Sequence, residues 1–116
     1  MRPIVVLALA CALTACGGGD PQSSANAVTR AVYNDNPAAV TAHLDDALRS
    51  QVSRASVGLI SDKMHALGSY NGLTLLGADT ASHEYTYRAN FSKGTLNVVI
   101  RLDTDGLLSA YRVFPT

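Results

Sequence analysis

Side chains that can exchange protons or hydrogen-bond a ligand alternate along one short segment in the second half of the chain. In the segment SHEYTYRANF, the ring side chains His83, Tyr85 and Tyr87 are two residues apart. Side chains at this spacing share one face of a β-strand, so an imidazole and two phenols would lie on the same wall. Such groups can act as general acids or bases, and Arg112, if it also faced inward, would bind an acidic ligand. These four residues are therefore our candidate pocket-lining residues.

The same face carries no carboxylate, because Glu84 is expected on the opposite face and Asp103 at the end of a strand. The simpler interpretation is that the two tyrosines and His83 fill the mouth of a hydrophobic core. Arg112 would then either extend its charged end to solvent or pair with one of these two carboxylates. We therefore favour a non-enzymatic role. A small-pocket enzyme that uses the tyrosines or the histidine as acid or base is the alternative.

Other chemistries find little support in the sequence. His43 and His65 are on separate predicted helices, with no cysteine or second histidine at ligand spacing, so we expect no metal site and no cofactor. Ser56 lacks the flanking glycines of a nucleophile elbow. Nine basic and nine acidic residues balance without a clustered basic face, which argues against nucleic-acid binding.

Three helices are expected before any strand, over residues 25–33, 37–48 and 53–68. Ser23 or Ser24 is the expected N-cap of the first helix, and Asn36 before a proline is a preferred start for the second. The third helix is the best defined of the three. Ser53 caps it, an apolar stripe runs along it, and Gly68 ends it because glycine enters the left-handed conformation freely.

Four strands are expected next, over residues 73–78, 82–91, 95–103 and 107–114, where the apolar period changes to two. Two registers fit the hairpin of the second and third strands. The first puts the turn at Lys93-Gly94. The second, shifted by two residues, puts Glu84 opposite Arg101 so that their charges pair.

The last strand is apolar on both faces, which indicates either cover on both sides or a bulge. The order of the elements predicts an α+β fold. We expect N-terminal helices followed by a curved four-stranded antiparallel sheet that packs on the third helix.

The start of the chain has the layout of a secretory signal peptide. Arg2 precedes an apolar run of roughly ten residues, too short to cross about 30 Å of hydrocarbon as a helix. The run ends in LTAC, residues 13–16, which resembles the lipobox of bacterial lipoproteins. The resemblance implies acylation of Cys16, cleavage before it and loss of Cys11 with the signal. Two or three acyl chains would anchor the protein stably in a membrane.

Gly17, rather than an aspartate, follows the cysteine. In the lipoproteins that the segment resembles, this implies the outer membrane, with the domain facing the periplasm. We therefore expect a lipoprotein signal peptide over residues 1–15 and a lipidated cysteine with a flexible tether over 16–24. A single α+β domain over 25–116 would follow, and the stretched tether would reach roughly 25–30 Å.

The C-terminal segment LDTDGLLSAYRVFP carries a second resemblance. Its Asp103, Gly106, Leu108, Ala110 and Pro115 are similar to the last hairpin of small secreted domains in the nuclear-transport-factor-like superfamily. The resemblance covers residues 26–115 and implies the cone-shaped α+β fold of ketosteroid isomerase and scytalone dehydratase. The chain differs in having no clear strand around residues 49–52.

The expected function is that of a membrane-anchored envelope lipoprotein that binds an unidentified protein or small molecule without catalysing a reaction. Membrane lipid would be its partner through acylated Cys16. An isomerase- or dehydratase-type enzyme is the alternative. A homodimer through the outer sheet face is a further alternative, and the residues expected there are Thr86, Arg88, Asn97 and Val99.

Overall fold

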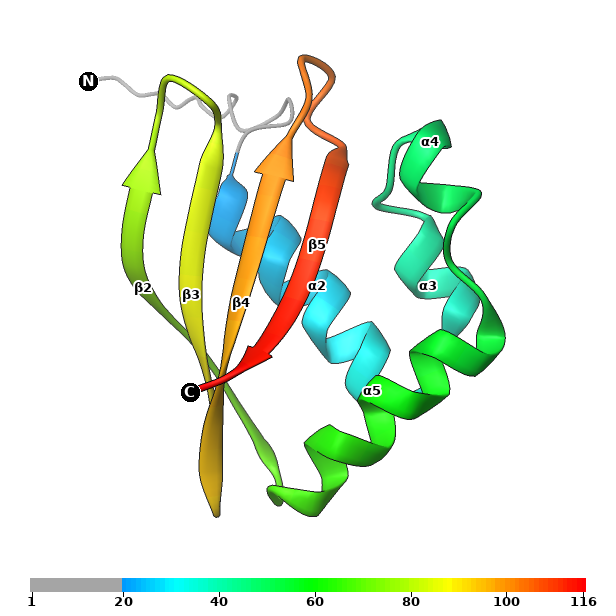
Figure 1. The fold of residues 1–116 in the computed structure, drawn as a ribbon, viewed down its shortest axis with the longest axis vertical. Helices are drawn as coiled ribbons and strands as arrows, with labels where there is room; N and C mark the ends of the chain where they lie inside the picture. Colours follow the sequence, from blue (N-terminus) through cyan, green and yellow to red (C-terminus); the bar gives the residue numbers. More distant parts are fainter. Residues whose placement is uncertain (1–19) are drawn as a thin grey trace, which may run out of the picture.

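The structure is a computed structural model that describes residues 20–116. Within these residues, four helices come first: α2 (Pro21–Tyr33), α3 (Pro37–Thr41), α4 (Asp46–Arg49) and α5 (Arg54–Ala66). Four strands follow: β2 (Tyr70–Asp79), β3 (Glu84–Phe91), β4 (Gly94–Leu102) and β5 (Leu108–Pro115). They form one curved, unclosed antiparallel sheet in the order β2-β3-β4-β5 (Figure 1). The predicted α+β fold class is confirmed, and the predicted signal peptide and Cys16 lie outside the described residues.

Helix α2 begins earlier than the sequence pattern predicts. Asp20 is its N-cap, and the Asp20 carboxylate accepts a hydrogen bond from the Gln22 amide at 3.1 Å. Pro21 takes the first helical position, where its missing amide proton leaves no donor unpaired. The prediction of a serine N-cap is therefore wrong, and residues 21–24 are helical rather than part of a tether.

The second predicted helix is divided into α3 and α4. Asn36 caps α3 as expected, but the chain leaves the helical path after Ala42. Leu44, which is 1 % exposed, forms an isolated parallel bridge with Leu108 at the start of β5. The Leu108 amide donates to the His43 carbonyl at 2.9 Å, and the Leu108 carbonyl accepts from the Asp45 amide at 2.8 Å. This contact with the sheet overrides the local preference for one continuous helix.

Helix α5 has the boundaries that its sequence indicates. Ser53 and Ser56 form a reciprocal capping box, in which each side chain accepts a hydrogen bond from the other residue's backbone amide at 3.1 Å. The helix ends just before Gly68, whose φ of 100° lies in the left-handed region.

The hairpin of β3 and β4 adopts the second of the two expected registers. Glu84 lies opposite Arg101, their charged groups are 3.5 Å apart, and Phe91 pairs with Gly94. The turn therefore consists of Ser92 and Lys93, and the register with the turn at Lys93-Gly94 is wrong.

Strand β5 contains a bulge, one of the two explanations for its apolar composition. Leu102 pairs with Leu108, whereas Arg101 pairs with Ala110, so Ser109 is the extra residue. One extra residue reverses which side chains face the core beyond it. Leu108 faces inward before the bulge, and Tyr111 faces inward after it, opposite the buried Ile100.

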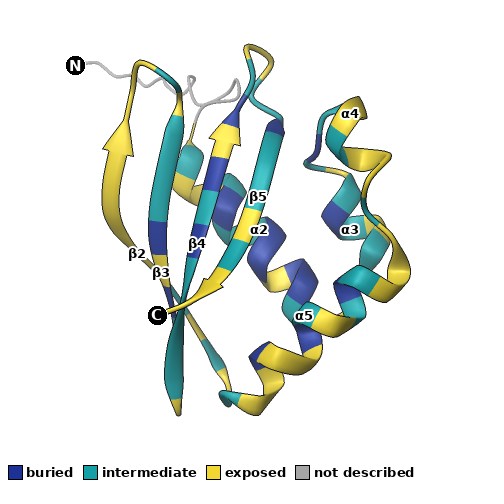
Figure 2. Ribbon diagram, viewed as in Figure 1, coloured by how far each residue is buried: buried dark blue, intermediate teal, exposed yellow. Residues whose placement is uncertain are grey.

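The core lies between the helices and the inner face of the sheet (Figure 2). The largest fully buried side chains are Tyr87, Leu44, Met64, Ile100, Leu108, Val28, Val98 and Thr29. Helix α2 runs along the inner face and contributes five buried residues, whereas α5 contributes three (Figure 1). Helix α2 is therefore the principal cover of the sheet. The sequence pattern instead predicts that the sheet packs on the third predicted helix, which is α5.

Candidate functional site: a pocket between the helices and β5

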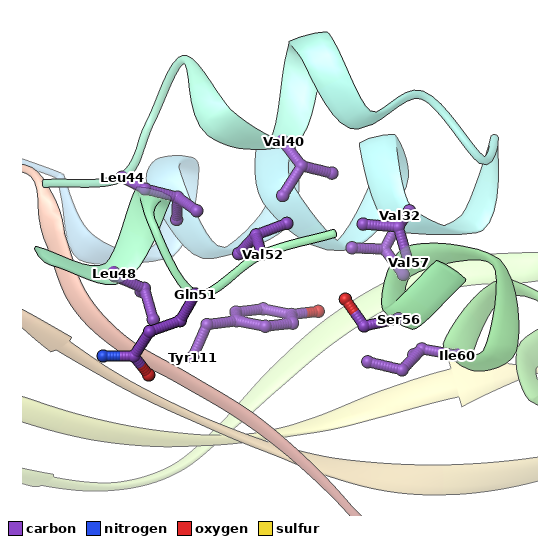
Figure 3. Close-up of a pocket in the computed structure, with 10 residues that line it drawn as sticks. All are labelled: Val32, Val40, Leu44, Leu48, Gln51, Val52, Ser56, Val57, Ile60 and Tyr111. Atoms are coloured by element: carbon purple, nitrogen blue, oxygen red, sulfur yellow. The ribbon is translucent and has the colours of Figure 1, made fainter. Parts of the chain in front are cut away.

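A pocket of about 190 Å³ lies between the helical layer and the inner face of β5 (Figure 3). Apolar side chains from three helices form one side of it, namely Val32 of α2, Val40 of α3, and Val57 and Ile60 of α5. All four are aliphatic, and Ser56 of α5 is the one polar side chain that these helices add to the lining.

The segment between α3 and α5 closes the other side of the pocket with Leu44, Leu48 and Val52. Leu44 is held there by its backbone bridge to Leu108, so the break between α3 and α4 directly shapes the pocket. Gln51 also lines the pocket, but it is exposed, and in Figure 3 its amide points away from the Tyr111 hydroxyl.

Tyr111 extends across the pocket from the sheet side (Figure 3). Its hydroxyl lies 2.9 Å from the hydroxyl of Thr29 on α2, and either oxygen can be the donor. Burial raises the pKa of Tyr111 well above its usual range, against a smaller lowering effect of the hydrogen bond to Thr29. The phenol is therefore neutral, and its proton is available as a hydrogen-bond donor at neutral pH.

Ser56 is the remaining polar side chain on the wall. Its hydroxyl donates to the Ser53 carbonyl at 2.9 Å and accepts from the Ser53 amide. The capping box that starts α5 thus already uses its proton, and Ser56 can offer a ligand only an acceptor.

An aromatic cluster that does not line the pocket links α2, α5 and β2. The rings of Tyr33 and His65 stack with centroids 4.1 Å apart, and His65 Nε2 lies 2.8 Å from the Tyr33 carbonyl. Tyr70 donates to the Asn26 side chain at 2.6 Å, and burial raises the pKa of Tyr70 to about 12. His65 therefore has a structural contact within the fold.

The four sequence-predicted candidates do not converge on this pocket. His83 is exposed in the turn before β3, with a φ of 57°, so it does not continue the inward face of the strand. Tyr85 and Tyr87 do face inward. Tyr87 is 1 % exposed and packs in the core, where burial raises its pKa to about 12, with smaller raising effects from Asp20 and Tyr85.

Arg112 is exposed on the outer face, opposite Val99, because the bulge turns it outward. Its expected partners are engaged elsewhere: Glu84 faces Arg101, and the Asp103 side chain accepts from the Asp105 and Leu107 amides. The expectation that Arg112 faces inward and lines a pocket is therefore wrong, and so is its expected pairing with Glu84 or Asp103. Tyr111, which the sequence reasoning missed, takes the inward position, and the apolar character of both strand faces was its only signal.

Within residues 20–116, no group of three or more His, Cys, Asp or Glu side chains is arranged to hold a metal ion. No helix in this part of the chain is long and apolar enough to span a membrane.

No protein-family model, curated protein or solved structure significantly matches the chain. The resemblances to lipoproteins and to the nuclear-transport-factor-like superfamily therefore stay predictions, and the chemistry of the pocket carries the functional argument.

Proposed function

We propose that the chain is a lipid-anchored envelope protein whose domain binds a small, largely apolar molecule without catalysing a reaction. The supporting observation is the pocket of about 190 Å³, with its aliphatic walls and Tyr111 across it. An apolar protein cavity of about 150 Å³ is large enough to bind benzene. A pocket slightly larger than that suits a single ring with a short substituent.

The anchor in this proposal is Cys16, for which the lipobox-like segment at residues 13–16 is the support. The acyl chains would hold the protein in the outer membrane, and the domain would face the periplasm. A binding role suits a tethered domain, because a small ligand can reach a fixed pocket by diffusion.

Ethylbenzene is a suitable probe of the pocket because it is one ring with a two-carbon substituent. A ligand that binds only the native state, at ten times its Kd, adds about 1.4 kcal/mol to the free energy of unfolding. We expect the Tm, measured by circular dichroism, to rise by roughly 5–10 °C.

Val52→Phe provides the matched test, because Val52 lines the pocket and the added ring would fill it. The control is Val99→Phe, which adds the same ring to a half-buried position on the outer sheet face. Ethylbenzene should stabilise the control variant as it does the parent, and its effect on Val52→Phe should be lost. Equal stabilisation of both variants, or none of the parent, would contradict the proposal.

A further inference from the structure

The Thr29–Tyr111 pair holds two hydroxyl protons but only one hydrogen bond. The two oxygens are 2.9 Å apart, and within residues 20–116 neither hydroxyl makes another hydrogen bond. Thr29 is fully buried, and Tyr111 is half-buried as a residue, with enough burial at its hydroxyl to raise its pKa. Whichever hydroxyl donates, the proton of the other is buried without an acceptor, which carries a free-energy cost.

Only one of the two hydroxyls is accessible to a molecule in the pocket. Tyr111 lines the pocket, whereas Thr29 lies behind it on α2. When Thr29 donates to the Tyr111 oxygen, the Tyr111 proton is free to point elsewhere. An acceptor atom in the pocket would take that proton, so both hydroxyl protons would then be satisfied.

No other side chain that lines the pocket competes with Tyr111 as a hydrogen-bond donor to the ligand. The Ser56 proton is bonded to the Ser53 carbonyl, and the Gln51 amide is exposed to water. The remaining lining residues are aliphatic. Tyr111 is therefore the one lining side chain with a buried proton to donate.

The wall also limits the charge of the ligand. No lining side chain is charged, so a carboxylate or an ammonium group would lose its hydration without gaining an ionic partner. A neutral acceptor, such as a carbonyl oxygen, loses less hydration and gains the Tyr111 hydrogen bond.

We infer that the pocket selects a neutral, largely apolar molecule of about one ring that carries a single carbonyl-type oxygen, which accepts a hydrogen bond from Tyr111. This inference rests on the proposed function and narrows it to one chemical class. Thr29 is a positioning residue here, because it fills the acceptor site of Tyr111 and directs the phenolic proton into the pocket.

The test compares acetophenone with ethylbenzene, which has the same ring and chain length without the oxygen. Dissociation constants are measured by nuclear magnetic resonance titration of the parent, Tyr111→Phe and Thr29→Val. Tyr111→Phe should weaken acetophenone binding about tenfold and leave ethylbenzene binding within about twofold. Thr29→Val keeps the Tyr111 donor but removes the group that directs its proton, so it should weaken acetophenone binding by less than Tyr111→Phe does and leave ethylbenzene binding unchanged. Benzoate should bind more weakly than acetophenone in every variant.

The infrared carbonyl band of acetophenone bound to the parent protein gives a readout that needs no variant. We expect it at lower frequency than in hexane, because a hydrogen bond weakens the carbonyl bond. An unshifted band, or acetophenone affinity that does not depend on the Tyr111 hydroxyl, would overturn the inference while ethylbenzene binding still supported the pocket. If neither probe binds, the proposed function fails and the inference fails with it.

Discussion

Tyr111 owes its inward position to a residue that does not line the pocket. Ser109 is the extra residue of the β5 bulge, and if β5 alternated regularly from Leu108 without a bulge, Ala110 and Arg112 would face the core. The sequence indicates that β5 is unusual, because both of its faces are apolar, but it does not show where the alternation reverses. The residues that line the pocket could therefore not be predicted from strand periodicity alone.

The buried tyrosines make a prediction about alkaline stability. The pKa values of Tyr70 and Tyr87 are raised to about 12 by burial, above the ordinary value of 10.0, and that of Tyr111 is raised further. A raised pKa means that the folded state holds the proton more tightly, so the stabilisation is complete below pH 10 and is lost as the pH rises toward 12. We expect the Tm to fall over that interval.

Ultraviolet absorbance of phenolate against pH measures the titration directly, and Tyr70→Phe should remove one late-titrating group and flatten the fall in Tm. Complete phenolate formation near pH 10 in the folded protein would contradict the raised pKa values.

At the scale of the elements, termini with specific capping residues were predictable and long-range contacts were not. Ser53 and Gly68 set the limits of α5 because their effects are local. The break between α3 and α4 depends on a bridge between Leu44 and Leu108, which are far apart in the chain. A pattern of apolar residues spaced by four predicts one helix there, since it contains no information about the sheet.

Gly68 gives a test at the junction of α5 and β2. A Cβ at this position would clash with Ser92 Oγ, which is held by a hydrogen bond from the Ser69 amide at 3.0 Å. Because φ is also positive, we expect Gly68→Ala to lower the free energy of unfolding by about 1–2 kcal/mol or more. Urea denaturation measures the change.

The control is Gly77→Ala, since a Cβ at Gly77 would have no heavy atom within 4 Å and its φ is not positive. This variant should be close to neutral. A Gly68→Ala protein as stable as the control would show that the junction adapts more freely than its geometry indicates.

For the molecule as a whole, the early start of α2 shortens the proposed tether between Cys16 and the domain. If Cys16 is the anchor, only residues 17–19 separate it from the Asp20 cap. The four peptide steps from Cys16 to Asp20 span at most about 14 Å, roughly half of the reach expected for a tether that continues to residue 24. The domain would then stay close to the bilayer surface.

The anchor itself is tested by labelling cells with a palmitate analogue. Cys16→Ser should abolish both the label and membrane retention, because it removes the thiol that would carry the lipid. Cys11→Ser is the matched control and should keep both, since Cys11 would be discarded with the signal. A label that persists in Cys16→Ser would refute the lipoprotein assignment.

Both outer strands of the sheet have features that hinder pairing with another copy. β2 has irregular register at two points, between Tyr70 and Leu73 and between Leu75 and Gly77. β5 is occupied at Leu108 by the bridge to Leu44 and ends in Pro115, which has no amide proton to donate. If the protein is anchored at a membrane as proposed, it meets its own copies often, and these interrupted edges would keep such encounters from growing into aggregates.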